Sequence, residues 1–279
     1  MALKPNNQAG TLSGKEHGTN DTLTTPLHTG TPPPLEFFLG DADMMNDSSR
    51  GGNDVLIGVD GANERKVACG DAFMMEDSSR GGNDLIIGGT GGSGNQLLCG
   101  DACTMSDNAR GGNDLIIGGA GATNILIGDA CAMSDNARGG NDVLVAGNGV
   151  GINNMFGDAS GFGMASAMSG NAVGGNDTLI SGNAVDNMWG DGVISGTGVT
   201  TGADTFVFAP GNNADTINDF RQTDHDQIDV SAYGFDDIGD GDLHISLNGS
   251  GGTLIDFENG NSVTLVGFAG TLTASDFIF

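Results

Sequence analysis

The stretch GGNDLIIGGAGATNILIGDACAMSDNARGGND, residues 111–142, contains one full unit of a repeat that runs through most of the chain. The tetrad Gly-Gly-Asn-Asp occurs five times, at intervals of 30, 30, 28 and 35 residues, beginning at Gly51, Gly81, Gly111, Gly139 and Gly174. A second tag, Gly-Asp-Ala, begins at Gly40, Gly70, Gly100, Gly128 and Gly157, with Gly190-Asp191-Gly192 as a variant. Two tags in fixed alternation indicate a repeat architecture in which each unit stacks on the next.

Each unit reads as one coil with two short strands and two turns. In a strand, residues two positions apart lie on the same face. The expected strands contain such apolar pairs on either side of a central residue, namely Leu85 and Ile87, Leu115 and Ile117, and Val143 and Val145. The flanking glycines permit the positive φ angles that tight turns need. One coil cannot bury its apolar face, whereas a stack of coils can. The sequence therefore predicts an all-β fold, a parallel β-roll or β-solenoid with coils of about 30 residues.

The composition is strongly acidic. The 279 residues include 36 Asp and Glu but only 9 Lys and Arg, and the net charge is −27. Such a chain repels itself, so it is either disordered or neutralised by cations at organised carboxylate sites. The regular order of the residues favours cations. The shortage of basic residues argues against a nucleic-acid partner, and no apolar run approaches the roughly 20 residues of a membrane span.

The repeat resembles that of the RTX (repeats-in-toxin) family, whose nonapeptide is Gly-Gly-x-Gly-x-Asp-x-apolar-x. Here GGNDLIIGG carries the second half of that pattern and Gly-Asp-Ala the first. An insertion such as CTMSDNARG, residues 103–111, separates the two halves. The resemblance covers roughly residues 36–208 and implies that each long turn is an RTX turn with an expanded middle, which binds calcium.

Calcium takes six to eight oxygen ligands from carboxylates and backbone carbonyls, and stacked coils repeat them about every 4.8 Å. The candidate ligands that open the long turns are Asp41, Asp71, Asp101, Asp129, Asp158 and Asp191. Those that close the turns are Asp54, Asp84, Asp114, Asp142, Asp177 and Asp204. The alternative is that these residues cap turns through local hydrogen bonds. The short turns end in Asn, which predicts a metal-poor rim held by Asn and Gly hydrogen bonds.

The insertions add three more aligned sets of residues. They are Met45, Met75, Met105, Met133 and Met168; Asp47, Asp77, Asp107 and Asp135; and Arg50, Arg80, Arg110 and Arg138. They form either a binding surface along one rim or a structural layer, with Met packed over the sheet edge and Arg paired with acidic loops. We favour the structural interpretation because Met commonly fills gaps.

The four cysteines also follow the repeat. Cys69 and Cys99 are equivalent positions, as are Cys103 and Cys131. Adjacent coils would bring such pairs within disulfide distance, and stacked free thiols are the alternative. Cys103 and Cys131 form the better disulfide candidate because they fall in the long turns.

The two ends of the chain differ from the repeats. We expect residues 1–35 to be mostly extended or flexible. Within them, GTNDTL, which starts at Gly18, resembles a degenerate copy of the repeat and predicts an extra coil. The calcium-binding coils are expected over residues 36–200. Residues 201–279 are expected to form an antiparallel β cap with a core of Phe206, Phe208, Phe220, Tyr233 and Phe235. This region resembles the C-terminal part of RTX proteins exported by type I secretion systems, which would suit an N-terminus without an apolar signal peptide.

The expected function is structural. The sequence has no His-Glu-x-x-His zinc motif, no Gly-x-Ser-x-Gly nucleophile elbow and no phosphate-binding loop, so we do not expect an enzyme. We expect a secreted protein that folds on calcium outside the cell. Its partner would be itself, in a head-to-tail matrix, fibre or surface layer. The alternative is an adhesin whose long-turn rim binds a glycan, ice or a host surface, and a cell-surface polysaccharide is a further candidate partner.

Overall fold

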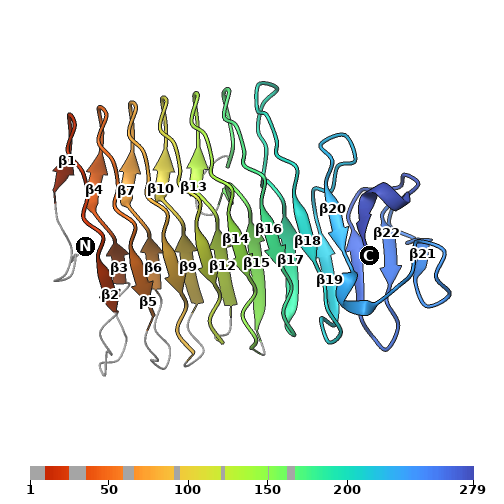
Figure 1. Ribbon diagram of the computed structural model, residues 1–279. Helices are drawn as coiled ribbons and strands as arrows, with labels where there is room; N and C mark the ends of the chain where they lie inside the picture. Colours follow the sequence, from red (N-terminus) through yellow and green to blue (C-terminus); the bar gives the residue numbers. More distant parts are fainter. Residues whose placement is uncertain are drawn as a thin grey trace.

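The computed structural model describes residues 10–24, 36–58, 66–90, 95–120, 123–149, 151–161 and 167–279. These residues form a parallel β-solenoid whose coils follow one another from left to right in Figure 1, with antiparallel strands at the right-hand end. The expected all-β stack of coils of about 30 residues is confirmed. The flexible-segment prediction for residues 1–9 and 25–35 falls outside the described residues, and so do parts of several short turns.

The four coils between residues 36 and 145 contribute three strands each, so the prediction of two strands was wrong there. The coils between residues 152 and 229 contribute two strands each, as predicted. In one coil, β9 (Asn95–Cys99) is followed by a bend at Gly100 and Asp101, and β10 (Ala102–Met105) continues directly from that bend. The chain then turns at the tip of the coil and returns to β11 (Leu115–Ile117). The stretch that begins at the Ala of Gly-Asp-Ala is a strand because it pairs in parallel with the same stretch of the next coil, and its first and last residues are buried.

The three strand positions of the coils form three sheets. In spatial order, the five-stranded sheet contains β1 (Thr11–Leu12), β4 (Ala42–Met45), β7 (Ala72–Met75), β10 and β13 (Ala130–Met133). The nine-stranded sheet contains β2 (Thr22–Thr24), β5 (Val55–Ile57), β8 (Leu85–Ile87), β11, β14 (Val143–Val145), β16 (Thr178–Ile180), β18 (Thr205–Val207), β20 (Gln227–Asp229) and β24 (Phe277–Ile278). The ten-stranded sheet contains β21 (His244–Leu247), β22 (Thr253–Asp256), β23 (Ser262–Leu265), β19 (Ala214–Ile217), β17 (Val185–Trp189), β15 (Ile152–Phe156), β12 (Thr123–Ile127), β9, β6 (Lys66–Cys69) and β3 (Glu36–Leu39).

The main core lies between the nine-stranded and ten-stranded sheets. The middle residue of each strand from β5 to β20 in the nine-stranded sheet is buried, which gives an in-register row of Leu56, Ile86, Ile116, Leu144, Leu179, Phe206 and Ile228. Burying one such side chain contributes roughly 1.5–3 kcal/mol. Because a one-residue slip would turn the whole row outward, this row fixes the register of the coils.

A second core fills the space behind the five-stranded sheet. It consists of the aligned methionines together with alanines such as Ala102, Ala109 and Ala130, all almost fully buried. Pairing of Met75 with Met105 and of Met105 with Met133 confirms the predicted alignment. The structural interpretation of these methionines is confirmed too, although they lie in the interior of the coil and not over a sheet edge.

The GTNDTL segment forms the extra coil that its sequence suggested. Within it, β2 pairs in parallel with β5, and Thr22 lies opposite Val55. The segment before it contributes β1, which pairs with β4. Residues 10–24 therefore belong to the solenoid, which corrects the expectation of a flexible segment for this part of the first 35 residues.

The last part of the chain closes the stack. Parallel pairing continues past residue 200, since β18 pairs with β16 and β20 pairs with β18. The final sheet turns antiparallel, with β21 against β22 and β22 against β23, as predicted. The structure also has two single-turn 3-10 helices, η1 (Ser231–Tyr233) and η2 (Ala274–Asp276). Among the predicted core aromatics, Phe206, Phe208 and Phe220 are buried, and Tyr233 and Phe235 pack against them partly buried.

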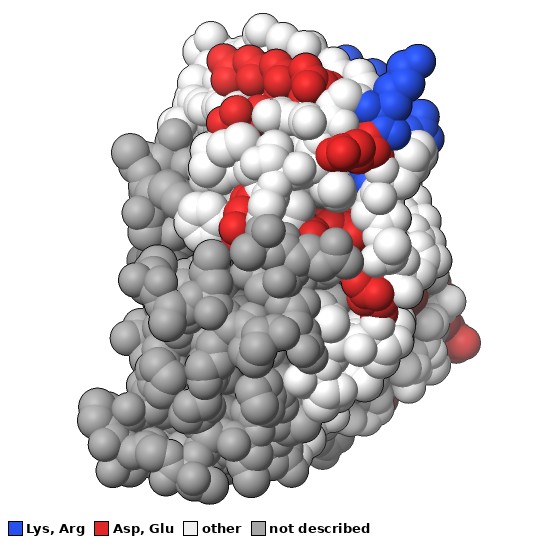
Figure 2. Space-filling model, turned by 90° about the vertical axis from the view of Figure 1, so that its left-hand side faces the viewer, with Lys and Arg blue, Asp and Glu red and all other residues white. Residues whose placement is uncertain are grey.

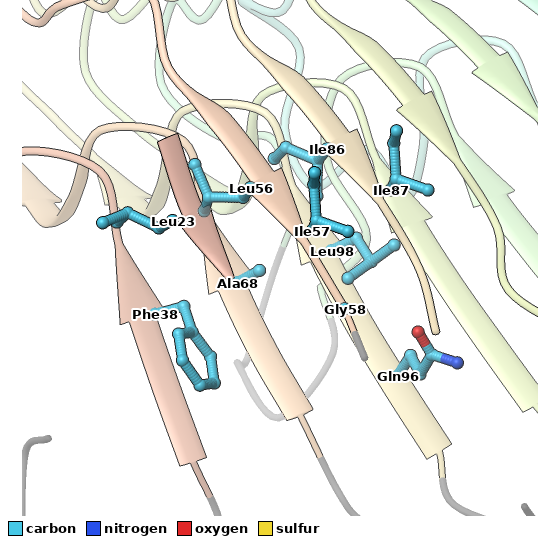
Figure 3. Close-up of a pocket in the computed structure, with 10 residues that line it drawn as sticks. All are labelled: Leu23, Phe38, Leu56, Ile57, Gly58, Ala68, Ile86, Ile87, Gln96 and Leu98. Carbon is cyan, nitrogen blue, oxygen red and sulfur yellow. The ribbon is translucent and has the colours of Figure 1, made fainter. Parts of the chain in front are cut away.

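No helix in the ranges given above has the length and hydropathy needed to cross a membrane. Near the N-terminal end, an apolar cavity lies between the nine-stranded and ten-stranded sheets (Figure 3). Its lining includes Leu23, Phe38, Leu56 and Leu98, with Gln96 at one end. The cavity is about as large as one water molecule, so it is a packing defect and not a pocket for a substrate.

Candidate functional site

Two rows of buried aspartates run along the inside of the coils, where the sequence placed its candidate ligands. The opening row follows the bend after the ten-stranded sheet and comprises Asp41, Asp71, Asp101, Asp129, Asp158 and Asp191. The closing row precedes the nine-stranded sheet and comprises Asp54, Asp84, Asp114, Asp142, Asp177 and Asp204. All twelve side chains are at most 3% exposed. Residues of this type are almost never so buried without a charged partner, so the rows need a compensating positive charge or proton.

The opening row spans the coil by hydrogen bonds to the backbone. In each case a carboxylate oxygen accepts the N–H of the second glycine of the next tetrad or its equivalent, at 2.6 to 3.1 Å. Asp101, for example, accepts from Gly112 at 2.8 Å. These bonds hold the two sides of the long turn together. At least one oxygen of each opening-row aspartate thus accepts a backbone N–H group, and both oxygens of Asp41 and Asp71 do so.

The closing row forms a continuous ladder along the axis. The Oδ1 atom of each member accepts the backbone N–H of the equivalent aspartate in the preceding coil, at 2.6 to 2.9 Å. One example is the 2.7 Å bond from the Asp84 N–H to Asp114. Each carboxylate thus links its own coil to the preceding one through its Oδ1 atom. Its Oδ2 atom is left for another partner.

Nine of the twelve second oxygens have no hydrogen-bond partner, although they are buried. These are the Oδ2 atoms of Asp54, Asp84, Asp101, Asp114, Asp129, Asp142, Asp158, Asp177 and Asp204. An unpaired buried polar group costs on the order of 1–3 kcal/mol, and a charged one costs more. A repeated set of such atoms is therefore not a tolerable defect of packing. It is the arrangement expected of sites that hold cations or protons.

The C-terminal end of the opening row shows how one of these oxygens is satisfied. The Arg221 guanidinium lies 3.0 Å from Asp191 Oδ2, and this oxygen is not among the unpaired atoms. Asp219 accepts the backbone N–H groups of residues 190–192 beside it. Asp226 ends the closing row by accepting the Asp204 N–H at 3.1 Å. Sequence reasoning missed these three residues, because they follow the last repeat tag and lie in a segment of different composition.

Burial also shifts the protonation of both rows. It raises the pKa of Asp54 to about 7 and that of Asp84 to about 9, from an ordinary value of 3.8. Repulsion from neighbouring carboxylates, such as that of Asp101 on Asp84, adds to the effect. The pKa of Asp114, Asp129, Asp142, Asp158, Asp177 and Asp204 is likewise raised well above 3.8, first by burial. Without a cation, the rows therefore hold protons at pH values where exposed aspartates are ionised.

The donor set suits a hard divalent cation. A Cβ atom added at Gly70 would overlap two oxygens, Asp84 Oδ2 and the Gly100 carbonyl. The same pairing of an unpaired carboxylate oxygen with a carbonyl recurs at Gly40, Gly100, Gly128 and Gly157. Carboxylate and carbonyl oxygens are the ligands that calcium prefers. Within the described ranges, however, no three His, Cys, Asp or Glu side chains meet in a metal-binding cluster, so carbonyls would have to complete each site.

The short-turn rim is held by side-chain amides, as predicted. Gln96 bonds to the backbone of Gly89, and Asn124 donates to Asn153 at 2.6 Å. Asn153 in turn donates to Asp186. These side chains are buried and each makes at least one hydrogen bond, although the Asn124 Oδ1 atom has no partner. This rim therefore has the Asn and Gly hydrogen bonds that the sequence indicated. That it is metal-poor stays a prediction.

The four cysteines gather in one buried corner beside the bend. All are free, and the two sulfur contacts that fall within hydrogen-bond distance join Cys69 to Cys103 at 3.3 Å and Cys99 to Cys131 at 3.7 Å. These contacts are diagonal between coils. They differ from the Cys103–Cys131 pairing favoured from the sequence, because the bend brings the end of one strand against the start of the next strand one coil away.

These features together define a parallel β-solenoid with three sheets and two internal aspartate rows. Compared with known proteins, the chain matches no protein-family model and no curated protein.

Proposed function

We propose that this protein is a secreted, calcium-binding structural protein of the RTX type, whose coils fold when calcium enters the aspartate rows. The observation that carries this proposal is the set of nine unpaired, buried aspartate oxygens. The contrast with Asp191 supports it, because there the chain supplies its own cation through Arg221. Calcium bound along the rows would supply the same compensation, through the twelve aspartates and neighbouring carbonyls.

The calcium claim is tested on the full chain by titration. Circular dichroism should show a coil-to-β change when calcium is added at neutral pH, and calorimetry should show the uptake of several ions. The variant D101N/D129N keeps the shape of two opening-row side chains but removes their charge. It should raise the calcium midpoint roughly tenfold or more. The control D107N/D135N alters exposed carboxylates in the same coils and should leave the midpoint unchanged.

A β spectrum that persists in chelator at neutral pH would sink the calcium proposal. So would a chain that folds but takes up no calcium. An equal effect of the two double variants would assign the binding to surface charge and not to the internal rows.

We further propose that the protein acts outside the cell and assembles head-to-tail, and this proposal gives it no catalytic role. In the described part of the chain, β1, β2 and β3 each have a neighbour on one side only, and such edges can pair with another chain. The C-terminal strands lie at the opposite end of the stack (Figure 1). Electron microscopy should show fibres or sheets with calcium and none in chelator. Monodisperse monomers at high concentration in calcium would contradict the assembly.

A further inference from the structure

Two rows of exposed charge lie at the tips of the long turns, outside the calcium proposal. The acidic tip row comprises Asp47, Asp77, Asp107 and Asp135, and the basic tip row comprises Arg50, Arg80, Arg110 and Arg138. All eight side chains belong to exposed residues. Viewed from the N-terminal end, acidic and basic side chains gather in separate groups at this tip (Figure 2).

The two rows have the same repeat and the same length. Successive arginines are bridge partners in parallel pairing. The backbone N–H of each of the first two tip aspartates donates a hydrogen bond to the carboxylate of the next one, as in the 3.0 Å bond from the Asp47 N–H to Asp77. Neighbours in both rows are therefore one strand spacing apart, about 4.8 Å. Both rows end at the same coil, where Gly170 and Val173 take the equivalent positions. The acidic and basic tip rows thus occupy the same four coils.

The rows do not neutralise each other within the molecule. Among the residues that the structure describes, the ion pairs within 4.0 Å involve Arg221 and His244 and none of the four tip arginines. This corrects the expectation that the tip arginines pair with acidic loops. The tip aspartates all have αL backbone, with φ near 57° to 59°, so the four tips share one turn conformation.

We propose that this tip is a lateral interface with a second copy of the chain. A twofold axis parallel to the solenoid axis would place the acidic row of each copy over the basic row of the other. It would leave positions along the stack unchanged, so all four coils would come into register at once. Such a contact is self-complementary and closed. It requires only folded coils, so it does not depend on the proposed head-to-tail assembly.

Charge complementarity favours a second copy over a uniform polyanion. An acidic polymer laid along the basic row would also run beside the acidic row of the same tips, which would repel it. A copy of the same tip presents each row with its opposite. The acidic and basic rows have the same number of charges, four each, and the same spacing. Another solenoid of this kind therefore matches both rows at once.

Two variants make the test. The first, R50E/R80E/R110E/R138E, has an all-acidic tip. The second has an all-basic tip, made by D47N/D77N/D107N/D135N together with S48K/S78K/N108K/N136K at neighbouring exposed positions. Asn tolerates the αL conformation of the replaced aspartates. Association is measured by sedimentation velocity in calcium, at low and high salt, after circular dichroism has confirmed that each variant is folded.

The wild-type protein should form dimers at low salt that weaken at least tenfold at high salt, because exposed charges are screened over a Debye length of about 8 Å at physiological ionic strength. Each variant alone should be monomeric, and their equimolar mixture should associate. A folded wild-type protein that stays monomeric at low salt would overturn the proposal. So would an all-acidic variant that dimerises like the wild type, or a monomeric wild type that binds polygalacturonate through its arginines.

Discussion

At the scale of single residues, the most informative contacts are those between the cysteine sulfurs. Each close pair contains one thiol with a lowered pKa and one with a raised pKa, and the four thiols act on one another across the pairs. Cys103 lowers the pKa of Cys69 to about 6, and hydrogen bonding with Cys103 and Cys99 lowers that of Cys131 to about 4. The pKa of Cys103 and Cys99 rises through the same contacts. One member of each pair is therefore the better nucleophile.

We predict that oxidation joins Cys69 to Cys103 and Cys99 to Cys131. In each bond two thiols lose two protons and two electrons to a small disulfide such as oxidised glutathione, which is reduced to two thiols. Mass spectrometry of unreduced peptides identifies the bonds, since trypsin together with cleavage before Asp101 separates Cys99 from Cys103. The C69S variant should lose the first bond and keep the second. A Cys103–Cys131 bond, as the sequence suggested, or four thiols that stay free in excess oxidant, would contradict this pairing.

At the scale of the strand and its turn, the spacing between coils is set by backbone contacts at glycines. Gly112 lies between the tip and β11, and a Cβ atom there would overlap the carbonyl oxygen of Gly82 in the preceding coil. That oxygen belongs to the backbone and cannot move without disturbing the pairing of the coils. The requirement for glycine here is steric, since the residue does not have a positive φ.

The G112A variant should therefore be destabilised by about 1–3 kcal/mol or more, as expected for overpacking against a rigid neighbour. The control is G249A, because nothing lies within 4 Å of the added Cβ at that exposed turn, and it should change stability by less than about 0.5 kcal/mol. Urea unfolding in saturating calcium measures both. Equal stability of the two variants would show that adjacent coils are not held at this distance.

Elements of the fold differ in how far the sequence could predict them. Parallel stacking and in-register rows were predictable, because the two tags recur and their spacing aligns residues such as Met105 with Met133. The third strand was not, because ACTM in β10 is short and small-sided, and it follows a bend that reads as the start of a loop. The positions of the aspartate rows were predictable from the repeat. Their unpaired oxygens and the ion pair of Arg221 with Asp191 were not predictable, because both depend on contacts between separate coils.

At the scale of the whole molecule, the net charge of −27 is divided between internal rows and surface. The surface carboxylates are solvated, whereas the internal ones are buried next to one another. Folding without a cation therefore requires that many internal carboxyls take up protons. Their pKa is raised in the folded state, so the folded chain binds protons more tightly than the unfolded chain does.

The sign of this linkage predicts an acid-stabilised fold in the absence of metal. The stability contributed by the internal rows is fully present below the unfolded pKa near 3.8, and it is lost as pH rises through folded values such as about 7 for Asp54 and about 9 for Asp84. Metal-free protein should thus show β structure near pH 4 and lose it toward neutral pH. Calcium should restore the fold at neutral pH, because it replaces the protons.

Circular dichroism of dialysed, calcium-free protein from acidic to neutral pH measures this transition. The matched comparison is the D101N/D129N variant, in which two internal carboxyls no longer titrate. Its metal-free unfolding should be shallower in pH than that of the wild type, because fewer protons are released on unfolding. The tip variant D107N/D135N should keep the wild-type slope. A metal-free chain that unfolds on acidification and folds on neutralisation would reverse the predicted sign, and it would show that the internal rows are ionised in the folded state without a cation.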